Sequence, residues 1–213
     1  MKDATGYASF AVRMRASGFD AERVMAAVEE ARRDRYVAPD DRPRAHSAEM
    51  LPLPCGQATE RLDDAVRMVA ALDIDHRHRV LEIGTGSGFL TDVLAQLAGR
   101  VVTVERYRSL LSDARERHAD RALATVTYHQ QDAGALPDLG GPFDRVISTV
   151  AFAQPPKQFV DHLVAEGVMV APIGPPEGPQ TVMRLGKIGA RFERENLFQG
   201  WFTPIETGVA LAL

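Results

Sequence analysis

Apolar positions recur at two different spacings along the chain, and the spacing changes near residue 79. Apolar residues between Val24 and Ala31 recur at helical spacing and follow Asp20, a good helix N-cap. A second apolar stripe from Leu62 to Leu72 predicts another helix. The first fifty residues are therefore expected to form an exposed helical appendage. The segment 39–54 holds four prolines, which predicts a surface loop.

Strand-like and helix-like runs alternate after residue 79. RVLEIG, VVTVE, ATVTYH, FDRVIS and VMVAPIG are strand-like, whereas SGFLTDVLAQLAG, YRSLLSDARERH and QFVDHLVAEG stand between them in helix positions. This alternation predicts an α/β fold, an open, mostly parallel, doubly wound sheet with helices on both faces. Past Gly178, TVMRLGKI, ARFERENLF and ETGVALAL follow one another as strands, which predicts an antiparallel edge.

Composition narrows the class of protein. In 213 residues, 45% are hydrophobic and 25% are charged, as in folded soluble proteins. Lys and Arg number 25 against 29 Asp and Glu, so the net charge of −4 argues against nonspecific binding to nucleic acid or to an anionic membrane. No apolar run is long enough for a membrane span. The single cysteine, Cys55, permits no internal disulfide, which favours the cytoplasm, and we expect no metal site.

The sharpest local signal is the E-x-G-x-G-x-G turn at residues 82–88 between a strand and a helix. Glycines at alternate positions let the backbone turn tightly and let a ligand lie against it. A dinucleotide fingerprint requires glycine at position 89, where Phe89 stands, so nicotinamide binding is the weaker interpretation. No lysine follows the turn as in a phosphate-binding P-loop.

Two acids stand at the ends of the next strands. Glu105 ends VVTVE, where a carboxylate can accept hydrogen bonds from a ribose diol, and Asp132 follows the third strand. The alternative is that the glycines only make a tight turn and both acids are solvated. The coincidence of a turn and two acids at consecutive strand ends favours a nucleoside-binding site.

These features resemble the class I S-adenosylmethionine-dependent methyltransferases. LPLPCGQATE, RVLEIGTGSGFLTDVLA, VVTVER, VMVAPIG and WFTPI are more narrowly similar to the protein-L-isoaspartate O-methyltransferase family, over nearly the whole chain. The resemblance implies a Rossmann-like methyltransferase core at residues 59–213, preceded by an N-terminal helical extension and acceptor-side loop at residues 1–58.

The resemblance implies S-adenosyl-L-methionine as cofactor and a protein or peptide carrying isoaspartyl residues as the methyl acceptor. The residues expected to hold the cofactor are Glu82, Gly84, Thr85, Gly86, Ser87, Gly88, Glu105, Arg106, Asp132, Ala133 and Thr149. On the acceptor side, Thr59 and Glu60 occupy the catalytic loop positions.

The acceptor loop departs from the family pattern L-P-I-G-x-G-Q-T-I-S. Ala58 stands at the Thr position, Thr59 at the Ile position and Glu60 at the Ser position. A carboxylate at Glu60 opposes an ionised acceptor, unless Arg61 neutralises it, it points outward, or the acceptor is neutral. Three interpretations stay open: an isoaspartyl methyltransferase, a methyltransferase for another acceptor, for which Glu60 would act as general base, and a cofactor-binding protein without turnover. A solvated loop glutamate is the simplest account of Glu60.

Overall fold

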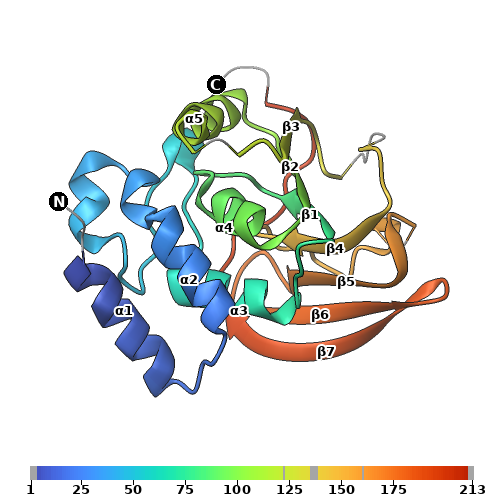
Figure 1. Cartoon of the computed structure of the whole chain (residues 1–213). Coiled ribbons are helices and arrows are strands. Elements are labelled where there is room, and N and C mark those ends of the chain that lie inside the picture. The colour runs from blue at the N-terminus through green and yellow to red at the C-terminus, as the bar shows by residue number, and fades with distance from the viewer. Residues whose placement is uncertain (1–3, 122, 135–138, 160, 211–213) are drawn as a thin grey trace.

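The protein is built on one seven-stranded sheet, seen in a computed structural model that describes residues 4–210 except 122, 135–138 and 160 (Figure 1). The strand order is β3-β2-β1-β4-β5-β6-β7. The strands are β1 (Arg79–Ile83), β2 (Arg100–Glu105), β3 (Val126–Gln130), β4 (Phe143–Ser148), β5 (Leu163–Ile173), β6 (Gln180–Ile188) and β7 (Arg191–Gly200). The first five pair in parallel, and β6 and β7 add antiparallel pairs at one edge. The expected open, mostly parallel sheet with an antiparallel edge is confirmed.

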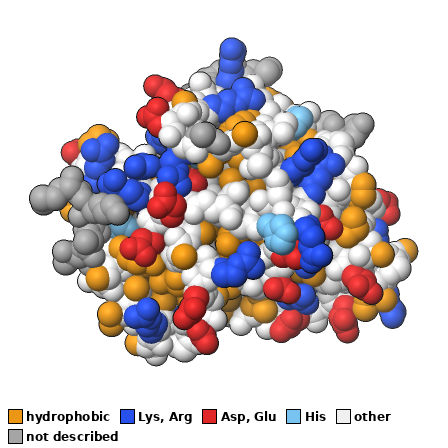
Figure 2. All heavy atoms as spheres, viewed as in Figure 1, with side chains coloured by type: hydrophobic (Ala, Val, Ile, Leu, Met, Phe, Trp, Pro, Cys, Tyr) orange, Lys and Arg blue, Asp and Glu red, His pale blue; other side chains and the backbone are white. Residues whose placement is uncertain are grey.

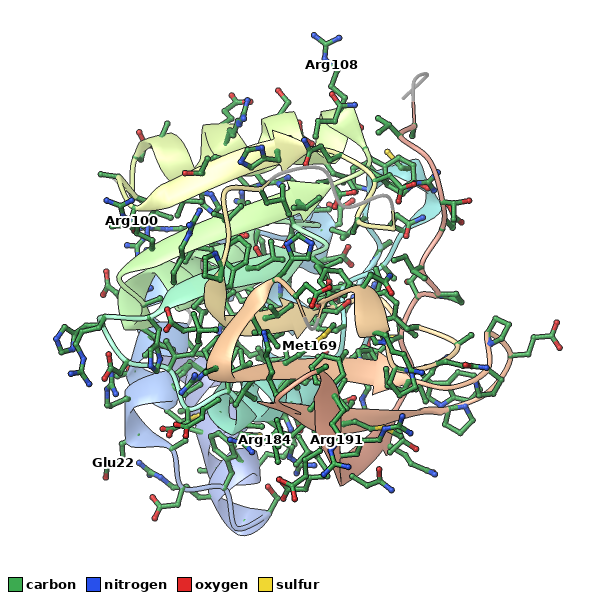
Figure 3. All side chains as sticks on the ribbon, turned by 90° about the vertical axis from the view of Figure 1, so that its right-hand side faces the viewer. Glu22, Arg100, Arg108, Met169, Arg184 and Arg191 are labelled. Carbon is green, nitrogen blue, oxygen red and sulfur yellow. The ribbon has the colours of Figure 1, made fainter. Side chains whose placement is uncertain are left out.

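The order of strands is visible from the side. In Figure 3, Arg100 of β2 lies in the upper part, Met169 of β5 near the middle, and Arg184 of β6 and Arg191 of β7 in the lower part. In Figure 2, basic and acidic side chains are interspersed over the face that is shown, in keeping with a net charge of −4.

The helices are α1 (Ala4–Ala16), α2 (Glu22–Ala31), α3 (Leu62–Ala71), α4 (Phe89–Leu97) and α5 (Arg108–Ala119). Short 3-10 helices are η1 (Arg33–Arg35), η2 (Pro39–Arg44), η3 (Pro54–Gly56) and η4 (Lys157–Phe159). The proline-rich segment 39–54 therefore contains the short helix η2, and η3 begins at its last residue, Pro54. Among the described residues, the four α-helices α1–α4 contribute to one apolar core. The opposite face of the sheet is covered by η4 and loops, so the helices expected on both faces are reduced there, in the described part of the chain, to one short turn.

The N-terminal helices are more buried than their sequence suggests. Phe10 and Met14 of α1 are fully buried, and Val28 of α2 is 1% exposed, in the same core as α3, α4 and the sheet. The expectation of an exposed appendage is wrong because the apolar stripe of each helix packs onto this core. Asp20 is not the N-cap of α2, because Ala21 occupies that position and makes no side-chain hydrogen bond to the helix.

One further element prediction is wrong, and another can be compared with the structure only in part. Residues 158–167 were expected in a helix, but η4 is a single turn and β5 already begins at Leu163. Phe159 and Leu163 are both buried against the sheet. Their spacing of four residues is compatible with a helix or with a strand, and the pairing of Leu163 with Phe143 of β4 favours the strand. The last expected strand, residues 206–213, lies partly outside the described residues, and within them only Ala210 forms an isolated bridge.

Candidate active site

The glycine turn lies between the end of β1 and the start of α4. Gly84, Gly86 and Gly88 all have positive φ, at 92°, 52° and 88°, which side chains rarely adopt. A Cβ at Gly84 would overlap the Thr149 hydroxyl, and one at Gly88 would lie 2.9 Å from His118 ring atoms. Glycine is therefore required here both by the backbone conformation and by close neighbours.

Glu105 closes β2 beside this turn. Its two carboxylate oxygens accept separate backbone hydrogen bonds, Oε2 from the Gly86 amide and Oε1 from the Tyr107 amide, both at 3.0 Å. Glu105 is 6% exposed. The carboxylate thus joins the glycine turn to the end of β2 and keeps further lone pairs for a ligand.

Glu82 is an internal acid beneath the turn. It is fully buried, and Oε2 accepts hydrogen bonds from the Thr91 hydroxyl at 2.5 Å and the Thr103 hydroxyl at 2.6 Å. Its Oε1 has no hydrogen-bond partner among the described residues. Burial outweighs both hydroxyl hydrogen bonds and raises the pKa of Glu82 to about 8, so the carboxyl is mainly protonated at neutral pH.

The loop of residues 53–60 forms the opposite wall. Glu60 is partly exposed to the space between the walls, whereas Thr59 is 5% exposed. Arg61 does not neutralise Glu60, because its Nε donates to the Ala48 carbonyl at 2.8 Å. The nearby cation is instead buried Arg33; enclosure raises the pKa of Glu60 and the Arg33 charge opposes that rise.

A third wall comes from the end of the described chain. Tyr107 accepts a hydrogen bond from the Gln57 amide at 3.2 Å and donates one to Glu206 at 3.3 Å. Arg106 pairs with Glu206 and donates to the Gly208 carbonyl at 3.0 Å. These contacts tie the loop 53–60, the end of β2 and the segment 203–208 together.

The three walls enclose a pocket of about 870 Å³, counted out to open solvent. Its wall includes the turn residues 84–87, Glu105, Arg106, Ala133 and Thr149, as well as Thr59 and Glu60 of the loop. A wall of glycine-turn backbone, the Glu105 carboxylate and the apolar side chains of Val104 and Leu110 suits a nucleoside-sized ligand.

Three predicted residues do not line this pocket: Glu82, Gly88 and Asp132. Glu82 lies beneath the turn, and Gly88 begins α4. Asp132 accepts hydrogen bonds from the Gly134 and Gly208 amides at 2.7 and 2.6 Å, so it supports the segments beside the pocket.

Sequence reasoning missed Tyr107 and the segment 203–206, which also form the wall. WFTPI carried only a family resemblance, and no spacing rule links it to Glu105. Among the described residues, no cluster of three or more His, Cys, Asp or Glu is arranged to hold a metal ion. No helix in the described ranges is both long and apolar enough to cross a membrane.

Comparisons with known proteins agree with this architecture. The sequence model of the family Protein-L-isoaspartate(D-aspartate) O-methyltransferase (PCMT) matches residues 9–210. A protein-L-isoaspartate O-methyltransferase of Bradyrhizobium sp. (strain BTAi1) is 37% identical over 204 residues, covering 96% of this chain and 95% of the relative. The one from Rhizobium meliloti (strain 1021) is 36% identical over 200 residues, covering 94% and 98%.

A solved structure from Plasmodium falciparum, described as a protein-L-isoaspartate O-methyltransferase in complex with S-adenosyl-L-homocysteine, has the same fold. It superposes with a TM-score of 0.80 at 17% identity, over 94% of this chain and 98% of that one. The family model matches residues 9–210, and the relatives are more than 30% identical over nearly the full length of both chains. This chain belongs to the protein-L-isoaspartate O-methyltransferase family.

Proposed function

We propose that the protein transfers a methyl group from S-adenosyl-L-methionine to the carboxylate of isoaspartyl residues in damaged proteins or peptides. The observation that carries this proposal is that the glycine turn and Glu105 share one pocket with the loop carrying Thr59 and Glu60. A methyl donor and a methyl acceptor must meet in one enclosed space for an in-line displacement. Family membership and the named relatives support the choice of acceptor.

The groups that line the pocket suit the parts of S-adenosylmethionine. Residues 84–87 present backbone without bulky side chains to its methionyl part, and the Glu105 carboxylate suits the ribose diol. Val104, Leu110 and Ala133 supply apolar wall for the adenine ring. We assign Arg106 and Thr149 to the same end of the pocket. Asp132 is assigned through its neighbour Ala133, since its own carboxylate is engaged by backbone amides.

Two predicted residues act on the cofactor indirectly in this proposal. Glu82 supports the turn from below through Thr103, whose hydroxyl also contacts Thr85 at 2.6 Å. Gly88 begins α4 with positive φ, and its carbonyl lies 2.8 Å from His118 Nε2. Both residues therefore set the shape of the turn that faces the ligand.

When bound, S-adenosylmethionine supplies an electrophilic sulfonium methyl group. The acceptor carboxyl has an ordinary pKa near 4 and is ionised at neutral pH, so the protein needs no general base. Its residues must hold the carboxylate in line and exclude water. We assign the contact with the acceptor to Thr59 and Glu60, which line the loop end of the pocket.

Glu60 sets a condition on this chemistry. Two carboxylates about 4 Å apart repel by about 4 kcal/mol at an effective dielectric constant of 20, which is roughly a thousandfold in rate. Glu60 does not point outward, and Arg61 is engaged elsewhere, so two of the three ways to relieve this repulsion are absent. A raised pKa of Glu60 and the neighbouring Arg33 relieve it in part.

A second candidate function follows from the same residue. Glu60 in the pocket, together with Ala58 in place of a hydroxyl, favours a neutral amine or hydroxyl acceptor for which Glu60 would be the general base. The remaining alternatives are a protein that binds the cofactor without turnover and one that binds a nicotinamide.

The test is incubation with labelled S-adenosylmethionine and a peptide containing one isoaspartyl residue, with the same peptide containing aspartate as control. We expect methylation of the isoaspartyl peptide only. Tight binding of S-adenosylhomocysteine without transfer would contradict the proposal, as would saturation by NADH alone in a fluorescence titration. Glu60→Ser restores the family residue and is expected to raise the rate; an unchanged rate would show that the repulsion is already relieved.

We place the reaction in the cytoplasm, because a single cysteine in 213 residues is typical of proteins from reducing compartments. The acceptor is proposed to be a protein or peptide; the charge balance gives no support for nucleic acid or membrane as a partner.

A further inference from the structure

Arg33 is a buried cation behind the acceptor loop. It is 1% exposed and begins η1, directly after Arg32, whose left-handed backbone (φ 57°) ends α2 and turns the chain inward. Its guanidinium carbon lies 5.8 Å from the centre of the Phe89 ring. The turn at the end of α2 thus delivers a full positive charge to the space beneath residues 59 and 60.

Only neutral oxygens accept hydrogen bonds from Arg33 in the described part of the chain. Nη1 donates to the Ala45 carbonyl at 2.8 Å, and Nη2 donates to the Thr59 hydroxyl at 2.9 Å and the Glu60 carbonyl at 3.1 Å. Buried charges in proteins are ordinarily paired with an opposite charge. Of the two acids that act on Arg33 through space, Asp63 already forms a bidentate pair with Arg13 at 2.7 and 2.8 Å. The Glu60 carboxyl is therefore the acid left to compensate Arg33.

The Thr59 hydroxyl oxygen acts as an acceptor in both of its hydrogen bonds. Its oxygen accepts from Arg33 Nη2 at 2.9 Å and from the Leu51 amide at 3.0 Å. A hydroxyl oxygen has two lone pairs and one proton, so the proton of Thr59 is left to donate to a further acceptor. Thr59 lines the pocket, and a donor polarised by a guanidinium is suited to an anionic oxygen.

The charges at this end of the pocket do not exclude an anion. Arg33 and Glu60 together are neutral when both are ionised and positive when Glu60 holds a proton. Burial lowers the pKa of Arg33, but a guanidinium stays protonated at neutral pH. A carboxylate that enters the pocket thus meets a compensated site, although a second carboxyl lines the same wall.

We propose that Arg33 is a positioning residue for the methyl acceptor: through the Thr59 hydroxyl it fixes a hydrogen-bond donor toward the acceptor carboxylate, and its charge compensates Glu60. This inference rests on the proposed function. The family pattern has hydroxyl side chains at positions 58 and 60, where this chain has Ala58 and Glu60, so Thr59 carries the one hydroxyl among these three loop positions. The donor has moved to position 59, and the buried arginine fixes its direction.

The first test compares Thr59→Val with Thr59→Ser in the full-length protein. Valine keeps the shape and removes the hydroxyl, whereas serine keeps it. We expect Thr59→Val to raise KM for the isoaspartyl peptide roughly tenfold or more, the loss of one hydrogen bond to a charged group. Thr59→Ser is expected to stay within about threefold of the unmodified protein. Calorimetric affinity for S-adenosylhomocysteine is expected to be unchanged in both, since Thr59 contacts the acceptor end.

The second test examines the charge. Arg33→Met leaves Glu60 uncompensated and is expected to raise KM at least as much as Thr59→Val, while Arg33→Met with Glu60→Gln recovers part of the loss. Arg35→Met, in the same 3-10 turn but exposed, is the matched control and is expected to have no effect. If Arg33→Met does not fold, Arg33→Lys keeps the charge and Thr59→Val decides the question alone.

The outcomes separate this inference from the proposed function. If the unmodified protein methylates the isoaspartyl peptide and Thr59→Val keeps the original KM, the inference is wrong and the proposed function stands. An equal KM for Arg33→Met alone and for Arg33→Met with Glu60→Gln overturns the compensation by charge. If the unmodified protein binds S-adenosylhomocysteine but does not methylate the peptide, both fail.

Discussion

Replacing Glu105 by glutamine tests the centre of the proposed cofactor site without changing its shape. The two carboxylate oxygens accept one backbone hydrogen bond each, from Gly86 and Tyr107 at 3.0 Å. Glutamine has one acceptor oxygen and one NH₂ group, so one of the two amides would face a donor. Loss of one charge-assisted hydrogen bond costs about 1.5–3 kcal/mol of unfolding free energy. For a chain of this length the melting temperature should fall by about 3–12 °C.

Binding should weaken in parallel, because a ribose diol would lose its charged acceptor. The same energy range predicts a roughly 10- to 150-fold rise in Kd for S-adenosylhomocysteine, measured by calorimetry. Glu116→Gln, on the exposed face of α5, is the control and should change neither quantity. An unchanged Kd with a lowered melting temperature would show that Glu105 holds the turn and not the ligand. If both stay unchanged, the reasoning is refuted.

Three further substitutions test the frame of the site. Gly84→Ala has to overcome both a positive φ of 92° and overlap with Thr149, so we expect a loss of more than about 1 kcal/mol of stability and of cofactor binding; calorimetry showing normal affinity would contradict this. Asp92→Asn removes a fully buried partner of Arg121, 2.8 Å away, and should lower the free energy of unfolding by about 3 kcal/mol in urea titrations; a loss below about 1 kcal/mol would count against it. Glu82, with a pKa raised to about 8, keeps its proton in the folded state while the unfolded state loses it near 4.5, so stability should fall as pH rises from about 4.5 to 8. Glu82→Gln should flatten that fall in melting temperature, and an equal pH dependence in both proteins would contradict the protonated carboxyl.

The features that sequence predicted well are local. The glycine turn and the strand ending in Glu105 are each contained within a few residues, and the carboxyl ends of neighbouring parallel strands must meet at one edge of a sheet. Residues 84–87 and Glu105 therefore lie in one pocket, as their order along the chain implied.

The features that sequence did not predict depend on contacts between distant segments. The Tyr107 hydroxyl contacts Gln57 and Glu206, which lie 50 and 99 residues away in the sequence, so its place in the pocket wall could not be read from its neighbours. In the sequence, Arg33 is one of several arginines in a polar stretch. In the fold, the turn at the end of α2 buries it, and no local pattern indicates that burial. Likewise, the spacing of Phe159 and Leu163 satisfies burial as helix or strand, and only pairing with a neighbouring strand decides between them.

The chain of contacts from Gln57 through Tyr107 to Glu206 has a consequence for how the pocket behaves as a whole. Besides its local hydrogen bonds, each wall is held by contacts with another wall, so local opening of one wall weakens the support of the others. A ligand that fills the pocket will therefore slow amide exchange and proteolysis in the loop 53–60 and in the segment 203–208 together, although no strand connects them.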